Sequence, residues 1–133
     1  MKTNKTMKNG EIFEMATKLL EAFPQLEDEK EAKTYPIKVL FYLRKNMKNL
    51  TVLAQDIEKA RIEIVKRYGT PMEDNPEQYQ FESPEKIDAA NKEFEELFSL
   101  EQDIEMYTIP LDSFGDMQLT EKQMDAVMEM IEE

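Results

Sequence analysis

Residues 36–69 read PIKVLFYLRKNMKNLTVLAQDIEKARIEIVKRYG. Apolar side chains recur along this stretch at alternating steps of three and four residues, a seven-residue repeat that places one apolar seam on a single long helix. Pro36 suits the first turn of that helix, and Gly69 suits a left-handed position just past its end. The seam comprises Leu40, Leu43, Met47, Leu50, Ala54, Ile57, Ile64 and Tyr68, with Arg61 as its interruption.

The length of this seam limits the possible folds, because a long apolar stripe has to be covered by an equally long partner. An antiparallel helical hairpin within one chain would satisfy it, and so would a homodimer in which two long helices pair. We predict a mainly α fold: a long antiparallel helical hairpin with an N-terminal helix, a short C-terminal helix and room for a small two-stranded β-ribbon. We expect residues 1–133 to form a single helical domain, with residues 1–8 frayed.

Local signals mark the remaining elements. A first helix should begin near Asn9, a residue type that caps helices. Ser83 and Pro84 are the residue types of a helix cap and a first helical position, and the three–four spacing resumes after them. Alternating apolar residues predict a strand within residues 103–111, which could pair with residues 78–81 as a ribbon.

The composition removes most catalytic chemistry. The chain contains no cysteine, histidine or tryptophan, so it lacks thiolate nucleophiles, disulfides, the usual near-neutral acid–base group and the commonest zinc ligand. Its 3 glycines lie far apart and form no phosphate-binding loop. Asp112 and Asp116 flank a predicted turn, but their spacing fits no calcium loop. We therefore expect no catalytic residue, no metal site, no cofactor and no enzymatic activity.

The net charge of −12 hides a division between two halves of the chain. Residues 1–68 contain 14 Lys and Arg against 10 Asp and Glu, a balance of +4, whereas residues 69–133 contain 3 against 19, a balance of −16. Either the basic long helix attracts the acidic helix that follows it, or an acidic face is presented to a basic partner. The basic side chains are spread around the long helix, and no stretch approaches the roughly 20 apolar residues of a membrane span. We therefore expect no direct binding to nucleic acid or to a membrane.

The C-terminal segment is rich in methionine, with 4 of the 10 methionines in the last 17 residues. A capping box at residues 120–123 predicts a last short helix whose apolar face holds Met124, Val127, Met128 and Ile131. Methionine fills gaps in cores and also makes adaptable binding surfaces, so this helix docks either within its own chain or on a partner. Together with the acidic side chains, the partner-binding candidates are Glu93, Glu95, Glu96, Asp103, Glu105, Met124, Met128 and Ile131.

The ending of the chain resembles a known family. The segments YTIPLDSFGDMQLT (107–120) and QMDAVMEMIEE (123–133) are similar to the closing segment of small proteins of unknown function encoded by phages and prophages of Gram-positive bacteria. The resemblance covers nearly the whole chain from Met7 onward. It extends to the shorter motifs NGE (9–11), PIKV (36–39), KRYG (66–69) and NKEFEEL (91–97).

The resemblance implies that the chain is a phage accessory or structural protein. It identifies no catalytic or ligand-binding residue. Combined with the missing chemistry, it predicts a non-catalytic protein that acts by binding another protein, from the phage or from the host. The alternative is an acidic inhibitor of a bacterial defence nuclease, of the anti-CRISPR or anti-restriction type, that occupies a nucleic-acid-binding surface. We expect a cytoplasmic location in the bacterial host, with association with the virion left open.

Overall fold

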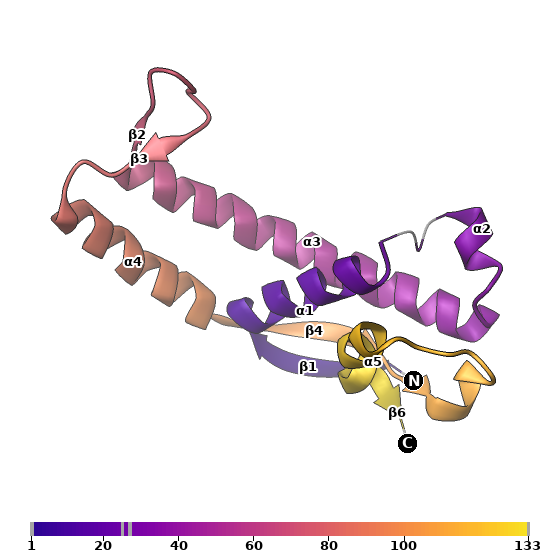
Figure 1. The fold of residues 1–133 in the computed structure, drawn as a ribbon. Helices are drawn as coiled ribbons and strands as arrows, with labels where there is room; N and C mark the ends of the chain where they lie inside the picture. The colour runs from indigo at the N-terminus through magenta and orange to yellow at the C-terminus, as the bar shows by residue number, and fades with distance from the viewer. Residues whose placement is uncertain (1, 25, 27, 133) are drawn as a thin grey trace.

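The computed structural model describes residues 2–24, 26 and 28–132, apart from the side chains of Glu31 and Glu132. Its longest element, α3, runs the length of the molecule, and the other elements lie alongside it or at its ends (Figure 1). The elements in chain order are β1 (Lys2–Lys8), α1 (Asn9–Ala22), α2 (Glu29–Ala32), α3 (Ile37–Tyr68), β2 (Thr70–Pro71), β3 (Tyr79–Gln80), α4 (Pro84–Ser99), β4 (Glu101–Tyr107), β5 (Ile109–Pro110), η1 (Leu111–Phe114), α5 (Glu121–Val127), η2 (Met128–Met130) and β6 (Ile131–Glu132).

The structure confirms the long helix predicted from residues 36–69, because α3 begins directly after Pro36 and ends directly before Gly69. Its seam faces the interior, where Leu43 and Leu50 are fully buried and Ile57 is nearly so. Burial of these side chains, rather than helix propensity, provides most of the stability of a helix in a protein.

The predicted fold class, a mainly α hairpin, is wrong, because strands from the two ends of the chain contribute to the core. β1 pairs with β4 in an antiparallel register that runs from Lys2↔Tyr107 to Lys8↔Glu101, and β2–β3 and β5–β6 form two further small sheets. Three shorter elements cover α3 in place of one long helix. α1 and β4 lie against its N-terminal half and α4 lies against its C-terminal half (Figure 1). The fold is an α+β arrangement.

The N-terminal residues that were expected to be frayed form β1, so that expectation is wrong over residues 2–8. The segment is polar, with Met7 as its one buried residue, and therefore lacks the apolar alternation that marks strands in a sequence. Hydrogen bonding to the acidic strand β4 orders it instead. For example, the hydroxyl of Thr6 donates to the carboxylate of Asp103 at 2.7 Å.

The ribbon expected between residues 78–81 and 103–111 is also wrong, because β4 pairs with β1 and β3 pairs with β2. The alternation in β4 was nevertheless a true signal. Ile104 and Met106 are buried and belong to the core, while their neighbours along the strand face outward. The pattern indicated the strand, but it identified neither the partner strand nor which of the two faces is buried.

A buried asparagine joins β4 to α3. Asn46 is fully buried, and its side-chain amide donates to the carbonyl of Tyr107 at 2.8 Å while accepting the N–H of Tyr107 at 2.7 Å. Both backbone groups of the last strand residue are thereby satisfied inside the protein, as buried polar groups require. One turn further along α3, Asn49 donates to the carbonyl of Glu105 at 3.3 Å from a more exposed position.

Asn9 does not cap α1 as expected, because Lys8 holds the cap position. The buried side chain of Asn9 donates instead to the carbonyl of Leu97 at 2.9 Å and accepts from the side-chain amide of Gln102 at 2.7 Å. Its backbone N–H donates to the carbonyl of Leu100 at 2.8 Å. Asn9 therefore ties the start of α1 to the junction between α4 and β4.

Gly69 has extended backbone angles, φ −97° and ψ 164°, so the expected left-handed position is wrong. The chain passes directly from α3 into β2, and a Cβ atom on Gly69 would lie only 2.7 Å from the carbonyl oxygen of Val65 and 3.1 Å from Cβ of Tyr79. Close approach of the last turn of α3, and to a smaller extent of β3, therefore explains the glycine. The predicted caps of the last two helices, Ser83 of α4 and Thr120 of α5, are confirmed.

The C-terminal helix is present, and its expected apolar face is only partly right: Val127 is fully buried and Ile131 packs against the core. Ala126, Val127 and Met130 are buried, whereas Met124 and Met128 are 37% and 61% exposed. The α-helical part ends at Val127, but Ala126, Val127 and Met130 keep the three–four spacing of a helix across η2, so the buried face is rotated by about one residue from the expected one. The chain then adds β6 in parallel beside β5.

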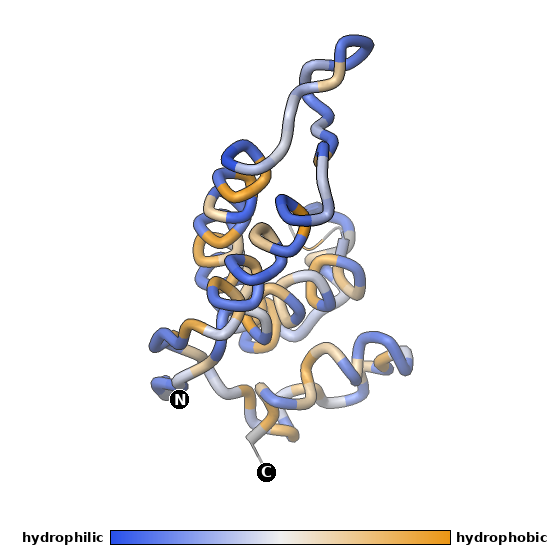
Figure 2. The backbone as a smooth tube through the Cα atoms, turned by 90° about the vertical axis from the view of Figure 1, so that its left-hand side faces the viewer, coloured by the Kyte–Doolittle hydropathy of each residue, from blue (hydrophilic) through white to orange (hydrophobic). Residues whose placement is uncertain are grey.

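The loop between β2 and β3 projects away from the rest of the molecule and is mostly hydrophilic at its tip (Figures 1 and 2). It contains Glu73, Asp74 and Glu77, all exposed. Among the described helices, none combines the length and the apolar composition needed to cross a membrane.

Candidate functional site

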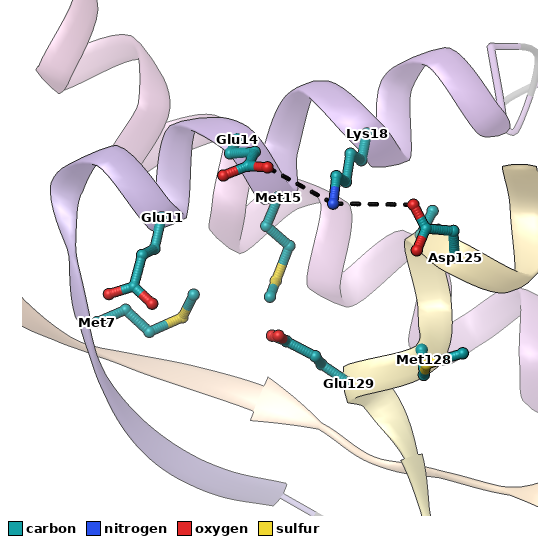
Figure 3. A pocket seen from close by; sticks show the side chains of 9 residues that line it. Met7, Glu11, Glu14, Met15, Lys18, Asp125, Met128 and Glu129 are labelled. Carbon is teal, nitrogen blue, oxygen red and sulfur yellow. Dashed lines mark ion pairs between the residues drawn. The ribbon is translucent and has the colours of Figure 1, made fainter.

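A groove opens between α1 and the C-terminal segment, with β1 along a third side (Figure 3). It encloses about 240 Å³. We call it the Met–acid groove, after the two side-chain types that dominate its lining. The lining residues are Met7, Glu11, Glu14, Met15, Lys18, Asp125, Ala126, Met128 and Glu129.

One wall of the groove is a face of α1. Glu11, Glu14, Met15 and Lys18 follow the three–four spacing that places side chains on the same side of a helix. The adjacent face of α1, which includes the fully buried Ile12, packs into the core. The position of the wall is therefore fixed by the burial of the neighbouring face.

The other wall comes from α5 and η2, and polar contacts link it to α1 and β1. Lys18 Nζ lies 3.6 Å from the Glu14 carboxylate and 3.8 Å from the Asp125 carboxylate, as the dashed lines in Figure 3 show. Lys5 Nζ donates to the backbone carbonyl of Glu129 at 3.3 Å. Exposed ion pairs contribute about 0–1 kcal/mol each, so the apolar packing of the C-terminal segment has the larger part in holding this wall in place.

The lining combines negative charge with an adaptable apolar surface. Four carboxylates and the ammonium group of Lys18 leave a net charge of −3 on the lining. Met7 is nearly buried, Met15 is half-buried and Met128 is exposed, so methionine side chains cover the space between the acidic groups. Methionine is flexible and polarisable, and it adjusts its shape to different apolar partners.

The acidic groups are distributed along both walls instead of converging on a point (Figure 3). Within the part of the chain that the structure describes, no three acidic side chains come together in a way that could hold a metal ion. Spread in this way, the carboxylates match a row of cationic side chains on a peptide better than a single ion.

The structure brings only one of the candidate residues predicted from the sequence into the groove, Met128. Met124 lies beside it and lines a shallower neighbouring hollow together with Glu121. Ile131 is partly buried in β6, opposite Ile109 of β5, and packs against the core.

The acidic candidates of α4 lie elsewhere. Arg67 Nη1 of α3 donates to Glu93 Oε1 at 2.6 Å, so Glu93 joins the two helices. The other oxygen of Glu93 is buried and has no hydrogen-bond partner among the described atoms. Glu95 and Glu96 are exposed on the outer side of α4.

The acidic candidates of β4 hold the terminal ribbon together. Asp103 accepts the hydrogen bond from Thr6 described above, and Glu105 lies 3.4 Å from Lys2 Nζ. Both pairs lie on the outward face of the β1–β4 sheet, whereas Met7, which lines the groove, is buried on the other face.

Sequence reasoning missed the other eight lining residues of the groove: Met7, Glu11, Glu14, Met15, Lys18, Asp125, Ala126 and Glu129. The spacing of Glu11, Glu14 and Met15 does place them on one face of α1, beside the face that packs into the core. Nothing in the sequence shows that this face meets the C-terminal segment. A groove between elements more than 100 residues apart in the chain becomes visible only once the tertiary contacts are known.

Arg61, which interrupts the apolar seam of α3, forms an ion pair with Glu58 of the same helix. Arg61 donates to both carboxylate oxygens of Glu58, from Nε at 2.9 Å and from Nη2 at 2.6 Å. The hydrogen bonds from Arg61, and to a smaller extent its positive charge, lower the pKa of Glu58, although partial burial opposes this shift. The same hydrogen bonds raise the pKa of Arg61. The seam therefore accommodates Arg61 without a second long helix.

Comparison with protein-family models, with curated protein sequences and with solved structures gives no match.

Proposed function

We propose that this chain is a non-catalytic protein that acts by binding another protein, and that the Met–acid groove receives a basic, amphipathic segment of that partner. The observation that supports the proposal is the lining itself, a net charge of −3 around methionine side chains. An amphipathic helix with lysine or arginine beside apolar residues complements such a groove in both charge and surface type.

The resemblance of the chain to small phage and prophage proteins suggests where this binding takes place. We propose a phage accessory or structural protein that works in the cytoplasm of the bacterial host or as part of the virion. Its partner would be a phage or host protein that presents a cationic segment.

The binding role can be tested with a synthetic amphipathic helical peptide of leucine and lysine as the probe. Binding of the labelled peptide to the full chain would be followed by fluorescence anisotropy. We expect the double variant Glu14→Lys, Glu129→Lys to raise the dissociation constant at least about tenfold, equivalent to about 1.4 kcal/mol. The single variant Met128→Ser should weaken binding as well, because it removes apolar contact without changing the charge.

The matched control is the double variant Glu73→Lys, Glu77→Lys, which changes the net charge equally in the projecting loop between β2 and β3. It should change the dissociation constant by less than about threefold, because charges separated by more than a Debye length are largely screened. Equal losses in the groove and loop variants would show that the peptide responds only to the overall charge, and the proposed site would be rejected.

The alternative, an acidic inhibitor of a bacterial defence nuclease, is favoured by the exposure of Glu95 and Glu96 on α4. Reversing Glu93 as well would break the contact with Arg67, so the informative variant is Glu95→Lys, Glu96→Lys alone. If the protein inhibits a nuclease through this face, the double variant should lose inhibition and inhibition by the unchanged protein should weaken steeply with salt. Unchanged inhibition by the variant would exclude the α4 face.

A further inference from the structure

A second surface, opposite in charge to the Met–acid groove, lies on the first half of α3. From Lys33 to Gln55 the chain contains five basic residues and no acidic residue, within a protein of net charge −12. Ile37 is 79% exposed and Phe41 is 53% exposed there. We call this surface the basic face. A shallow groove on it is lined by Ile37, Leu40, Phe41, Arg44, Lys45 and Lys48.

The side chains of the basic face are arranged for contact. Lys45 Nζ lies 5.6 Å from the centre of the Phe41 ring, within the range of a cation–π interaction. Arg44 donates to the carbonyl of Leu26 at 3.3 and 3.0 Å, which fixes its guanidinium group. The ion pairs among the described residues do not include Lys45 or Lys48. Exposed apolar side chains beside unpaired cations are typical of a protein-binding surface.

The chain itself contains a complementary surface. Glu121, Met124, Asp125 and Met128 share one face of α5 and its continuation, and all four are exposed. We call this surface the acidic ridge. It places carboxylates beside methionines at helical spacing, just as the basic face places Lys45 beside Phe41 at the same spacing.

We propose that the basic face of one copy of this chain binds the acidic ridge of a second copy. The methionines of the ridge cover Ile37 and Phe41, while Glu121 and the Oδ1 atom of Asp125, whose Oδ2 atom lies 3.8 Å from Lys18, meet Lys45 and Lys48. The ridge also forms one edge of the Met–acid groove. The inference therefore rests on the proposed binding function and names a second copy of the chain as a partner.

A contact between two different surfaces is heterologous, so each bound copy retains a free face and a free ridge. Further copies add to these free surfaces unless the rotation closes a ring. The average mass in solution should therefore rise with protein concentration beyond that of a single chain. Salt screens both the attraction between the two surfaces and the repulsion between two copies of net charge −12, so the charge swap, compared at the same salt concentration, decides the test.

The test is sedimentation velocity of the full chain over a range of protein concentrations at the same salt concentration, combined with a charge swap. Lys45→Glu with Lys48→Glu makes the face acidic, and Glu121→Lys with Asp125→Lys makes the ridge basic. Each double variant alone should remain monomeric, with a dissociation constant at least about tenfold above that of the unchanged chain. An equimolar mixture should associate again, because each surface then meets one of opposite charge. Circular dichroism checks that both variants fold.

An unchanged chain that stays monomeric at every concentration would overturn the inference. So would variants that associate as the unchanged chain does, or a mixture that stays monomeric. The leucine–lysine peptide separates this result from the proposed function. Groove-dependent peptide binding by a chain that never self-associates would leave the proposed function standing and remove only the second copy as a partner. If the charge-swapped mixture associates but the peptide does not bind, the proposal that the groove receives a basic segment would be rejected instead.

Discussion

Replacing Asn46 by alanine should destabilise the protein far more than its single side-chain amide suggests. The side chain is fully buried and satisfies both the N–H and the carbonyl of Tyr107, at 2.7 and 2.8 Å. An unsatisfied buried polar group costs about 1–3 kcal/mol. With two such groups left in the interior, we expect the free energy of unfolding to fall by about 2–5 kcal/mol. Only entry of water into the space left by the amide would keep the loss near the lower value.

The measurement is urea unfolding followed by circular dichroism, with linear extrapolation to zero denaturant. Asn49→Ala is the matched control. It removes the same kind of side chain one turn further along α3, where the hydrogen bond is longer, 3.3 Å, and the position is more exposed. We expect the control to cost less than about 1 kcal/mol. Amide hydrogen exchange at Tyr107 should accelerate in the Asn46 variant alone. A loss below about 0.5 kcal/mol, or equal losses in both variants, would refute the reasoning.

Three further outcomes follow from the structure. Leu50→Ala should lower the free energy of unfolding by about 2–5 kcal/mol in the same urea assay, because it opens a cavity in the seam of α3. Gly69→Ala should be destabilising, by about 1 kcal/mol or more, because the added methyl group would lie 2.7 Å from the carbonyl oxygen of Val65; a stability equal to that of the unchanged chain would contradict the close approach. Glu58→Gln should cost under about 1 kcal/mol at neutral pH, since its pair with Arg61 is partly exposed. The pKa of Glu58 is lowered in the folded state, so the pair contributes its full stability above the unfolded value of 4.5. The difference between the variant and the unchanged chain should shrink below pH 4.5 and disappear as the pH falls through the lowered folded-state pKa; a difference independent of pH would exclude this origin.

The helices could be read from the sequence because their signals are local. The seam of α3, the cap Ser83 and the capping box that starts at Thr120 all act within a few residues of chain, and each was found where expected. The buried face of the last helix was predicted only in part, because the local spacing does not show whether Met124 or Ala126 faces the elements that pack against this helix.

The strands and the groove could not be predicted because they depend on residues distant in sequence. The segment that forms β1 is polar and becomes a strand only through its pairing with β4. The sequence does not distinguish Asn46 from other polar residues on the helix, because its hydrogen-bond partner, Tyr107, is brought to it only by the tertiary fold. The Met–acid groove likewise exists only where α1 meets α5.

The pairing of β1 with β4 has a consequence for the order of events during synthesis. Of the described elements β1 leaves the ribosome first, but its partner strand ends at Tyr107, so β1 stays without its partner until about a hundred further residues have been made. The helices α1 and α3 contact each other earlier and do not depend on that delay. Closing so long a loop is slow compared with local contacts, so we expect the helical pair to form while the nascent chain is still tethered and the terminal ribbon to close last.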